Sequence, residues 1–110
     1  MSTRFTDTLH RLNATIGERK DAHPSTSYTA KLLAEGVERV AKKFGEEAIE
    51  LVIAAAGGNP EAAVAESADL IYHWLVLMAA SGVNLDQIAA ELERREGTSG
   101  LEEKAGRPKE

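Results

Sequence analysis

Residues 43–50 read KFGEEAIE and residues 66–73 read ESADLIYH. Each stretch holds two acidic side chains three positions apart, Glu47 with Glu50 in the first and Glu66 with Asp69 in the second. Residues three positions apart lie on the same face of an α-helix. The two stretches therefore predict two helices that each present a pair of carboxylates in one direction.

Apolar residues extend the first of these helices from about residue 37 to the Gly57-Gly58 pair, where it is expected to stop. One face of this central helix carries Val37, Val40, Ala41, Phe44, Ala48, Leu51, Val52 and Ala55, and Ile49 and Ile53 lie near the opposite side. A helix that is apolar on two sides belongs inside a bundle.

The second acidic helix is expected from Pro60 to Ser81, because Asn59-Pro60-Glu61 combines a capping side chain, proline at the first helical position and an acid near the positive end of the helix dipole. Most of this helix is apolar, and we expect Glu66 and Asp69 to be buried by their neighbours.

Three further helices follow from local signals. Apolar spacing predicts one from Phe5 to Ile16 and a short one from about Tyr28 to Glu35, capped by Ser25, Thr26 or Ser27. Asn84 with Gln87 three positions later has the pattern of a capping box and predicts a last helix that fades near Arg95. The predicted fold is an all-α bundle of about five helices, with one domain over residues 1–96 and a flexible charged tail over residues 97–110.

Composition narrows the class of protein. The chain has 110 residues, a formal net charge of -5 and no cysteine. These values argue against nucleic acid as a partner, and the missing cysteines fit a cytoplasmic location. The most apolar run, Leu70 to Ala80, is shorter than the roughly 20 residues of a membrane helix, and no signal peptide is recognised, so we expect neither membrane insertion nor export. The apolar surplus on the two long helices predicts a homodimer.

The four carboxylates indicate a metal site. A buried carboxylate without compensation costs several kcal/mol, so such residues are paired, protonated or bound to a metal. Two pairs from adjacent antiparallel helices offer only oxygen ligands, which favours Mg²⁺ or Mn²⁺ over a soft metal. The plain alternative is a solvated acidic face with an ion pair or two.

Several neighbouring side chains are candidates for substrate contacts, each with a structural alternative. Lys42 and Lys43 precede the acids by about one turn and could meet a phosphate, or serve only solubility. Tyr28 could stack on a base or pack in the core. His73, one turn after Asp69, could hydrogen bond there or be an ordinary core histidine.

Taken together, Ser27-Tyr28-Thr29, residues 43–50 and residues 66–73 resemble the phosphoribosyl-ATP pyrophosphatase family, and the resemblance extends to Ser99-Gly100, Glu103-Lys104-Ala105 and Arg107. It implies a helical dimer related to the MazG proteins, with Glu47, Glu50, Glu66 and Asp69 as the metal ligands. It also implies Mg²⁺-dependent hydrolysis of the α,β-phosphate anhydride of phosphoribosyl-ATP to phosphoribosyl-AMP and pyrophosphate, the second step of L-histidine biosynthesis.

The resemblance also suggests roles for single residues. Glu46 or Glu47 is the candidate general base. The candidate substrate contacts are Tyr28, Lys42, Lys43, His73, Lys104 and Arg107. Two other functions stay open from the sequence: a house-cleaning nucleoside triphosphate pyrophosphatase with the same metal site, and a non-catalytic helical dimerisation module.

Overall fold

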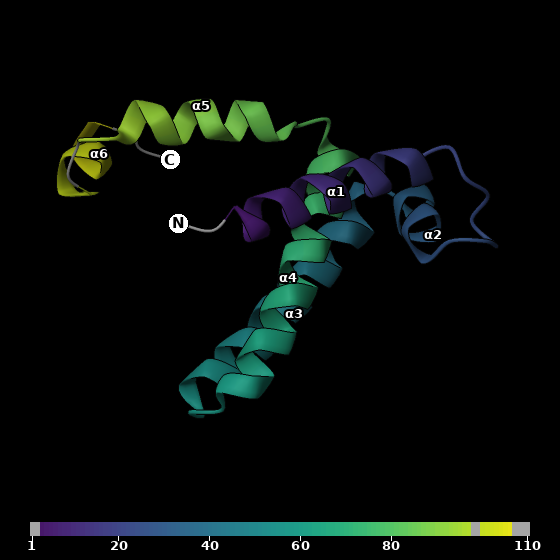
Figure 1. Ribbon diagram of the computed structural model, residues 1–110, viewed down its shortest axis with the longest axis horizontal. Helices are drawn as coiled ribbons and strands as arrows, with labels where there is room; N and C mark the ends of the chain where they lie inside the picture. The colour runs from purple at the N-terminus through teal and green to yellow at the C-terminus, as the bar shows by residue number, and fades with distance from the viewer. Residues whose placement is uncertain (1–2, 98–99, 107–110) are drawn as a thin grey trace.

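Six α-helices make up the part of the chain that the computed structural model describes, residues 3–97 and 100–106 (Figure 1). They are α1 (Arg4–Arg19), α2 (Tyr28–Glu35), α3 (Val37–Ala56), α4 (Pro60–Ser81), α5 (Leu85–Arg95) and α6 (Gly100–Gly106). Within these residues no strand is present, so the predicted all-α class is confirmed. The first five helices match the predicted ones. The short α6 was not predicted and lies in the segment expected to be a flexible tail.

Capping side chains fix where three of the helices begin. Ser27, Asn59 and Asn84 each accept a hydrogen bond from the main-chain N–H three residues later, at 3.2, 3.1 and 2.9 Å. The main-chain N–H of Asn84 in turn donates a hydrogen bond to Oε1 of Gln87 at 2.8 Å, which completes the predicted capping box. These bonds satisfy main-chain donors that the first turn of a helix leaves without a partner.

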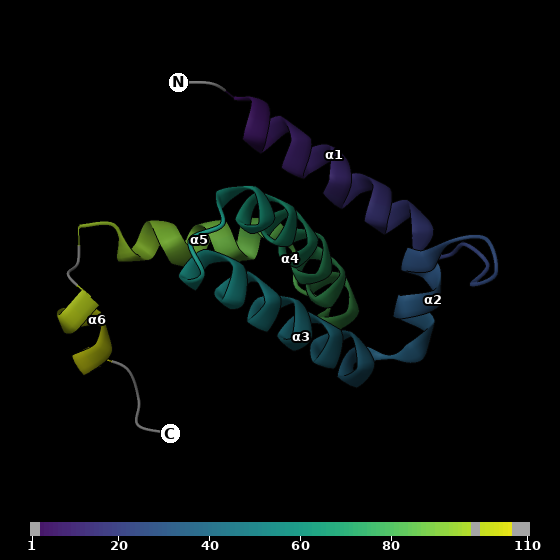
Figure 2. The ribbon, with the colours of Figure 1, turned by 90° about the horizontal axis from the view of Figure 1, so that it is seen from below.

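Glycine separates the short α2 from the long α3. Gly36 has a φ of 97°, a conformation that residues with a side chain rarely adopt, and it ends α2 and precedes the first residue of α3. The two helices therefore meet at an angle instead of forming one rod (Figure 2). This angle lets α2 lie against α3 and α4 near the start of α3.

The centre of the fold is an antiparallel hairpin of α3 and α4, joined by residues 57–59 (Figures 1 and 2). α1 packs on α4 and α2, and α2 packs on both helices of the hairpin. Five side chains from α1 to α4 form the buried core where these helices meet: Ile16, Leu32, Val40, Leu75 and Val76. α5 and α6 extend away from this core in both views.

The end of the hairpin far from the core leaves apolar side chains exposed. Ile49, Val52, Ile53 and Val64, called the distal patch below, are 62%, 64%, 67% and 72% exposed. The radius of gyration of 16.1 Å also exceeds the about 13 Å of a compact chain of this length. The expectation that α3 lies inside a bundle is therefore not met in the second half of this helix, as far as the described residues show.

The length and hydropathy of α4 also pass a simple test for a membrane-crossing helix. The core helices of soluble proteins pass the same test, so a single such helix is weak evidence.

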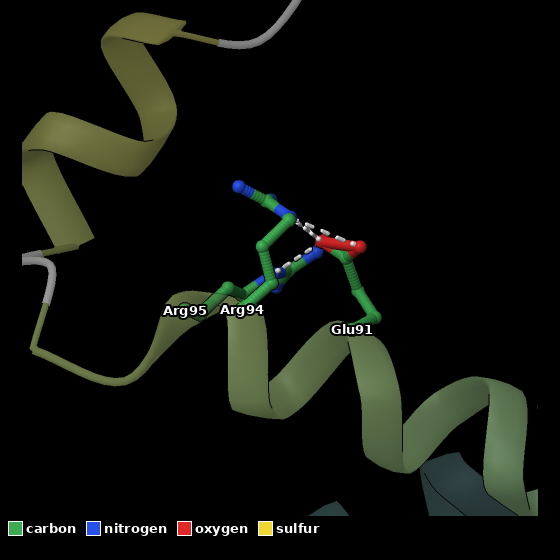
Figure 3. A network of polar contacts seen from close by, with 3 residues as sticks. All are labelled: Glu91, Arg94 and Arg95. Carbon is green, nitrogen blue, oxygen red and sulfur yellow. Dashed lines mark hydrogen bonds and ion pairs between the residues drawn. The ribbon is translucent and has the colours of Figure 1, made fainter.

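A small ion-pair network holds the last turn of α5 (Figure 3). Glu91 Oε1 accepts hydrogen bonds from Nη2 of Arg94 at 2.6 Å and from Nε of Arg95 at 3.2 Å. The hydrogen bonds from Arg94 and then Arg95 lower the pKa of Glu91 to about 2. Glu91 is therefore ionised at neutral pH. Its partners Arg94 and Arg95 lie in the last turn of α5, near the negative end of the helix dipole.

Candidate active site

Three of the predicted acids converge between α3 and α4. Glu47 on α3 and Glu66 and Asp69 on α4 each offer a carboxylate oxygen, and these three atoms lie within 4.8 Å of one another. Because the two helices run antiparallel side by side, one turn of α3 faces the first half of α4. The juxtaposition that the sequence predicted for Glu47, Glu66 and Asp69 is therefore present in the structure.

The buried oxygens of this acid triad lack protein partners. Glu47 is buried, with Oε1 3.6 Å from Nζ of Lys43, while its Oε2 has no hydrogen-bond partner. Oε2 of Glu66 is buried without a partner as well. Buried polar atoms are nearly always satisfied, so two orphaned carboxylate oxygens that face a third acid suit a hard cation. By donor chemistry, the site fits Mg²⁺ or Mn²⁺.

The structure places the other two acids of the first stretch differently. Glu50 is exposed and is not part of the acid triad. Glu46 is exposed too and lines a neighbouring cavity. The prediction that Asp69 is buried is wrong: the residue is exposed, because its carboxylate meets Glu47 and Glu66 at the solvent-facing edge of the contact between α3 and α4. Glu66 is half-buried.

His73 lies one turn after Asp69 and is buried. Its Nδ1 is 2.7 Å from the main-chain oxygen of Asp69. A carbonyl oxygen only accepts hydrogen bonds, so Nδ1 carries a proton and is the donor of this hydrogen bond. Nε2 is buried without a partner. One ring nitrogen is therefore satisfied as in an ordinary core histidine, and the other is buried without a partner.

An aromatic cluster joins α2 to α4 beside His73. The hydroxyl groups of Tyr72 and Thr29 form a short hydrogen bond across the two helices. Burial raises the pKa of Tyr72, and the bond to Thr29 partly opposes that shift. The ring of Tyr28 stacks on Tyr72 with centroids 6.4 Å apart and meets the edge of His73 at the same distance. These contacts fix the side chain of Tyr28, which stays about half exposed.

A cavity of about 390 Å³ lies between α2 and α3, next to the acid triad. We call it the α2–α3 pocket; its lining residues are Tyr28, Lys31, Leu32, Glu35, Arg39, Lys42, Lys43 and Glu46. Lys43 connects it to the acids, because the same side chain pairs with Glu47. The predicted contacts Tyr28, Lys42 and Lys43 all line this pocket.

The sequence reasoning missed other residues of this region. Lys31 lies three positions after Tyr28, so the i, i+3 spacing on a helix could have placed it on the same face. Thr29 and Tyr72 lie in the stretches singled out from the sequence, but their bond depends on how α2 meets α4. Lys104 is exposed on α6, at the opposite end of the molecule from α2, and Arg107 lies outside the described residues.

Comparison with known proteins shows to which family the chain belongs. The family model described as phosphoribosyl-ATP pyrophosphohydrolase matches residues 9–96. The chain belongs to this family. A protein of Caulobacter vibrioides named phosphoribosyl-ATP pyrophosphatase is 63% identical over 107 residues, which cover 97% of this chain and 99% of the relative.

Two further relatives of the same name support the family assignment. A protein of Parvibaculum lavamentivorans is 61% identical over 90% of this chain and 91% of its own length. One from Erythrobacter litoralis is 58% identical over 92% of this chain and 97% of its own length. The part of this chain that the family model matches thus includes most of α1 and all of α2 to α5. It therefore contains the whole acid triad.

Proposed function

We propose that this chain hydrolyses phosphoribosyl-ATP to phosphoribosyl-AMP and pyrophosphate, the second step of L-histidine biosynthesis. The observation that carries the proposal is the acid triad with its orphaned oxygens beside a pocket lined by cations. The relatives named phosphoribosyl-ATP pyrophosphatase, with identities of 58–63% over nearly the whole chain, give the substrate. In the reaction, water attacks phosphorus, the α,β-anhydride bond breaks and pyrophosphate leaves.

A divalent cation, Mg²⁺ or Mn²⁺, belongs to this proposal. Glu47, Glu66 and Asp69 would hold it, because their oxygens are close together and two of them have no protein partner. Glu50, one turn from Glu47, is exposed and would join through a change of rotamer. When bound, such an ion neutralises the charge of phosphate oxygens and makes water a better nucleophile.

The chain's own residues have distinct tasks in this scheme. Lys43 reaches from Glu47 into the α2–α3 pocket, where its ammonium group would stabilise negative charge on the leaving pyrophosphate. Glu46 is exposed at the same pocket and has no ion-pair or hydrogen-bond partner among the described side chains. Its carboxylate is therefore free to accept a proton from the attacking water. Glu47 is held by Lys43 and by the triad and is the weaker candidate base.

The same proposal includes a homodimer in the cytoplasm. The distal patch exposes four apolar side chains on the two helices of the hairpin, as expected for a surface that a second subunit covers. A twofold axis across the hairpin would bury this patch on both copies at once.

The decisive experiment measures pyrophosphate release from phosphoribosyl-ATP and from a panel of nucleoside triphosphates, with Mg²⁺ and with a chelator. We expect turnover of phosphoribosyl-ATP that stops with the chelator and in Glu47→Gln. The control Glu93→Gln makes the same change on exposed α5 and should keep full activity. Turnover of the panel instead would assign the chain to house-cleaning hydrolases, and no turnover of any substrate would favour a non-catalytic dimerisation module.

A further inference from the structure

The α2–α3 pocket has an unusual balance of charge. Four cationic side chains and two carboxylates line it, although the whole chain has a formal net charge of -5. Two of the cations are paired: Nε of Arg39 lies 3.4 Å from Oε2 of Glu35, and Lys43 pairs with Glu47. The pocket is therefore a local positive region on an acidic protein.

The other two cations of this pocket, Lys31 and Lys42, have no ion-pair or hydrogen-bond partner among the side chains that the structure describes. They come from different helices, α2 and α3, and line one cavity. Two unpaired lysines that line one cavity raise the local positive potential there and favour the binding of an anion.

The pocket extends away from the acid triad. On α3, Lys42 precedes Glu47 by five residues and Arg39 precedes it by eight, which corresponds to about 7.5 and about 12 Å along the helix axis. The volume of about 390 Å³ is in the range of small-molecule sites. An anion beside Lys31 and Lys42 would thus be a separate group from one held at the triad, yet within reach of the same ligand.

Phosphoribosyl-ATP has two such groups. Its triphosphate is the reacting group, and the added ribose carries a phosphate of its own that ATP lacks. Since Lys43 and a cation at the triad would contact the triphosphate, the second phosphate needs other cations farther along the ligand. Tyr28 also lines the pocket, where it is about half exposed and held by its contacts with Tyr72 and His73, so a purine ring could stack on it.

We infer that Lys31 and Lys42 bind the phosphate of the added ribose and so make the enzyme select phosphoribosyl-ATP over ATP. This inference rests on the proposed function and adds the residues that determine specificity. Arg39 lies at the far wall of the pocket, where its pair with Glu35 keeps it as a fixed positive charge rather than a direct ligand.

The first test is binding, measured by calorimetry with phosphoribosyl-AMP and AMP in the absence of turnover. The wild-type protein should bind phosphoribosyl-AMP more tightly than AMP. Lys31→Gln and Lys42→Gln should each weaken the binding of phosphoribosyl-AMP by about tenfold or more, because each removes one charge-assisted contact to phosphate. The affinity for AMP should stay unchanged. Lys20→Gln removes the same charge outside the pocket and should change neither affinity.

The second test is kinetic. In the two pocket variants, kcat/KM for phosphoribosyl-ATP should fall by a similar factor, mostly through KM, while inhibition by ATP stays as in the wild type. Both lysines are at least partly exposed through the pocket, and circular dichroism should show unchanged helicity.

Three outcomes would overturn the inference: no preference of the wild-type protein for phosphoribosyl-AMP, unchanged binding in both variants, or equal losses for phosphoribosyl-AMP and AMP. Equal losses would mean that the lysines bind a part that both ligands share. A wild-type protein that fails to hydrolyse phosphoribosyl-ATP refutes the proposed function instead, and the binding comparison still decides the role of the pocket.

Discussion

Replacing Glu47 by Gln should stabilise the metal-free protein and abolish its response to metal. The three ligand oxygens of the acid triad lie within 4.8 Å, so each pair repels by at least about 0.9 kcal/mol in water and about 3.5 kcal/mol at an effective dielectric constant near 20. The variant removes two such pairs. It also loses the attraction of Lys43 at 3.6 Å, about 1.2 to 4.6 kcal/mol over the same range. The net gain is about 0.6–2.3 kcal/mol.

Thermal unfolding with a chelator and with saturating Mg²⁺ measures this balance at one fixed protein concentration. Without metal, the midpoint of Glu47→Gln should exceed the wild type by several degrees, about 4–8 °C per kcal/mol for a domain of this size. With Mg²⁺ at a hundred times its Kd, the wild type gains about 2.7 kcal/mol and the order reverses. A variant that is less stable than the wild type under both conditions, or one that Mg²⁺ still stabilises equally, would refute the metal site. Glu93→Gln should follow the wild type throughout.

Three further predictions test the surroundings of the site. Tyr72→Phe and Thr29→Val should each lower the free energy of unfolding by about 1 kcal/mol or more and the double variant by little beyond either, because each single change leaves a hydroxyl without its partner; additive losses in urea titrations would contradict the bond. The pKa of Glu91, measured by NMR, should be about 2 and rise toward 4.5 in Arg94→Gln. Since folding lowers this pKa, the stabilisation by Glu91 is present above about pH 4.5 and lost as pH falls toward 2. Ile53→Glu should yield a monomer by light scattering where the wild type is a dimer, and a wild-type monomer would reject the distal patch as an interface.

The helices could be predicted from the sequence because their signals are local. Asn59 and Asn84 act on main-chain groups three residues away, and Gly82 ends α4 in a left-handed conformation that needs no information from the rest of the fold. The spacing of Glu66 and Asp69 likewise fixes that both lie on one side of α4. Such features depend only on the dihedral angles of a single helix.

Features that depend on two helices were predicted less well. Asp69 was expected to be buried because its neighbours in sequence are apolar, yet burial depends on how fully the other helices cover a position, and Asp69 is exposed although its carboxylate lies close to Glu47 of α3. Lys31 belongs to the α2–α3 pocket only because Gly36 turns α2 against α3. Neither the rotation of a helix about its axis nor the angle at a glycine follows from the periodicity of one segment.

The position of the acid triad along α3 relates metal binding to assembly. Glu47 follows the core residue Val40 by seven residues and precedes Ile53 of the distal patch by six, so it lies about 10 Å along the helix from each. Apolar contacts hold the hairpin on the side of Val40, where its side chain is fully buried, whereas the described residues leave Ile53 67% exposed. The carboxylates repel one another between these two regions. A second subunit on the distal patch would restrain the hairpin on the open side, and a bound cation would remove the repulsion. Dimerisation and metal binding should therefore stabilise the same stretch of the hairpin.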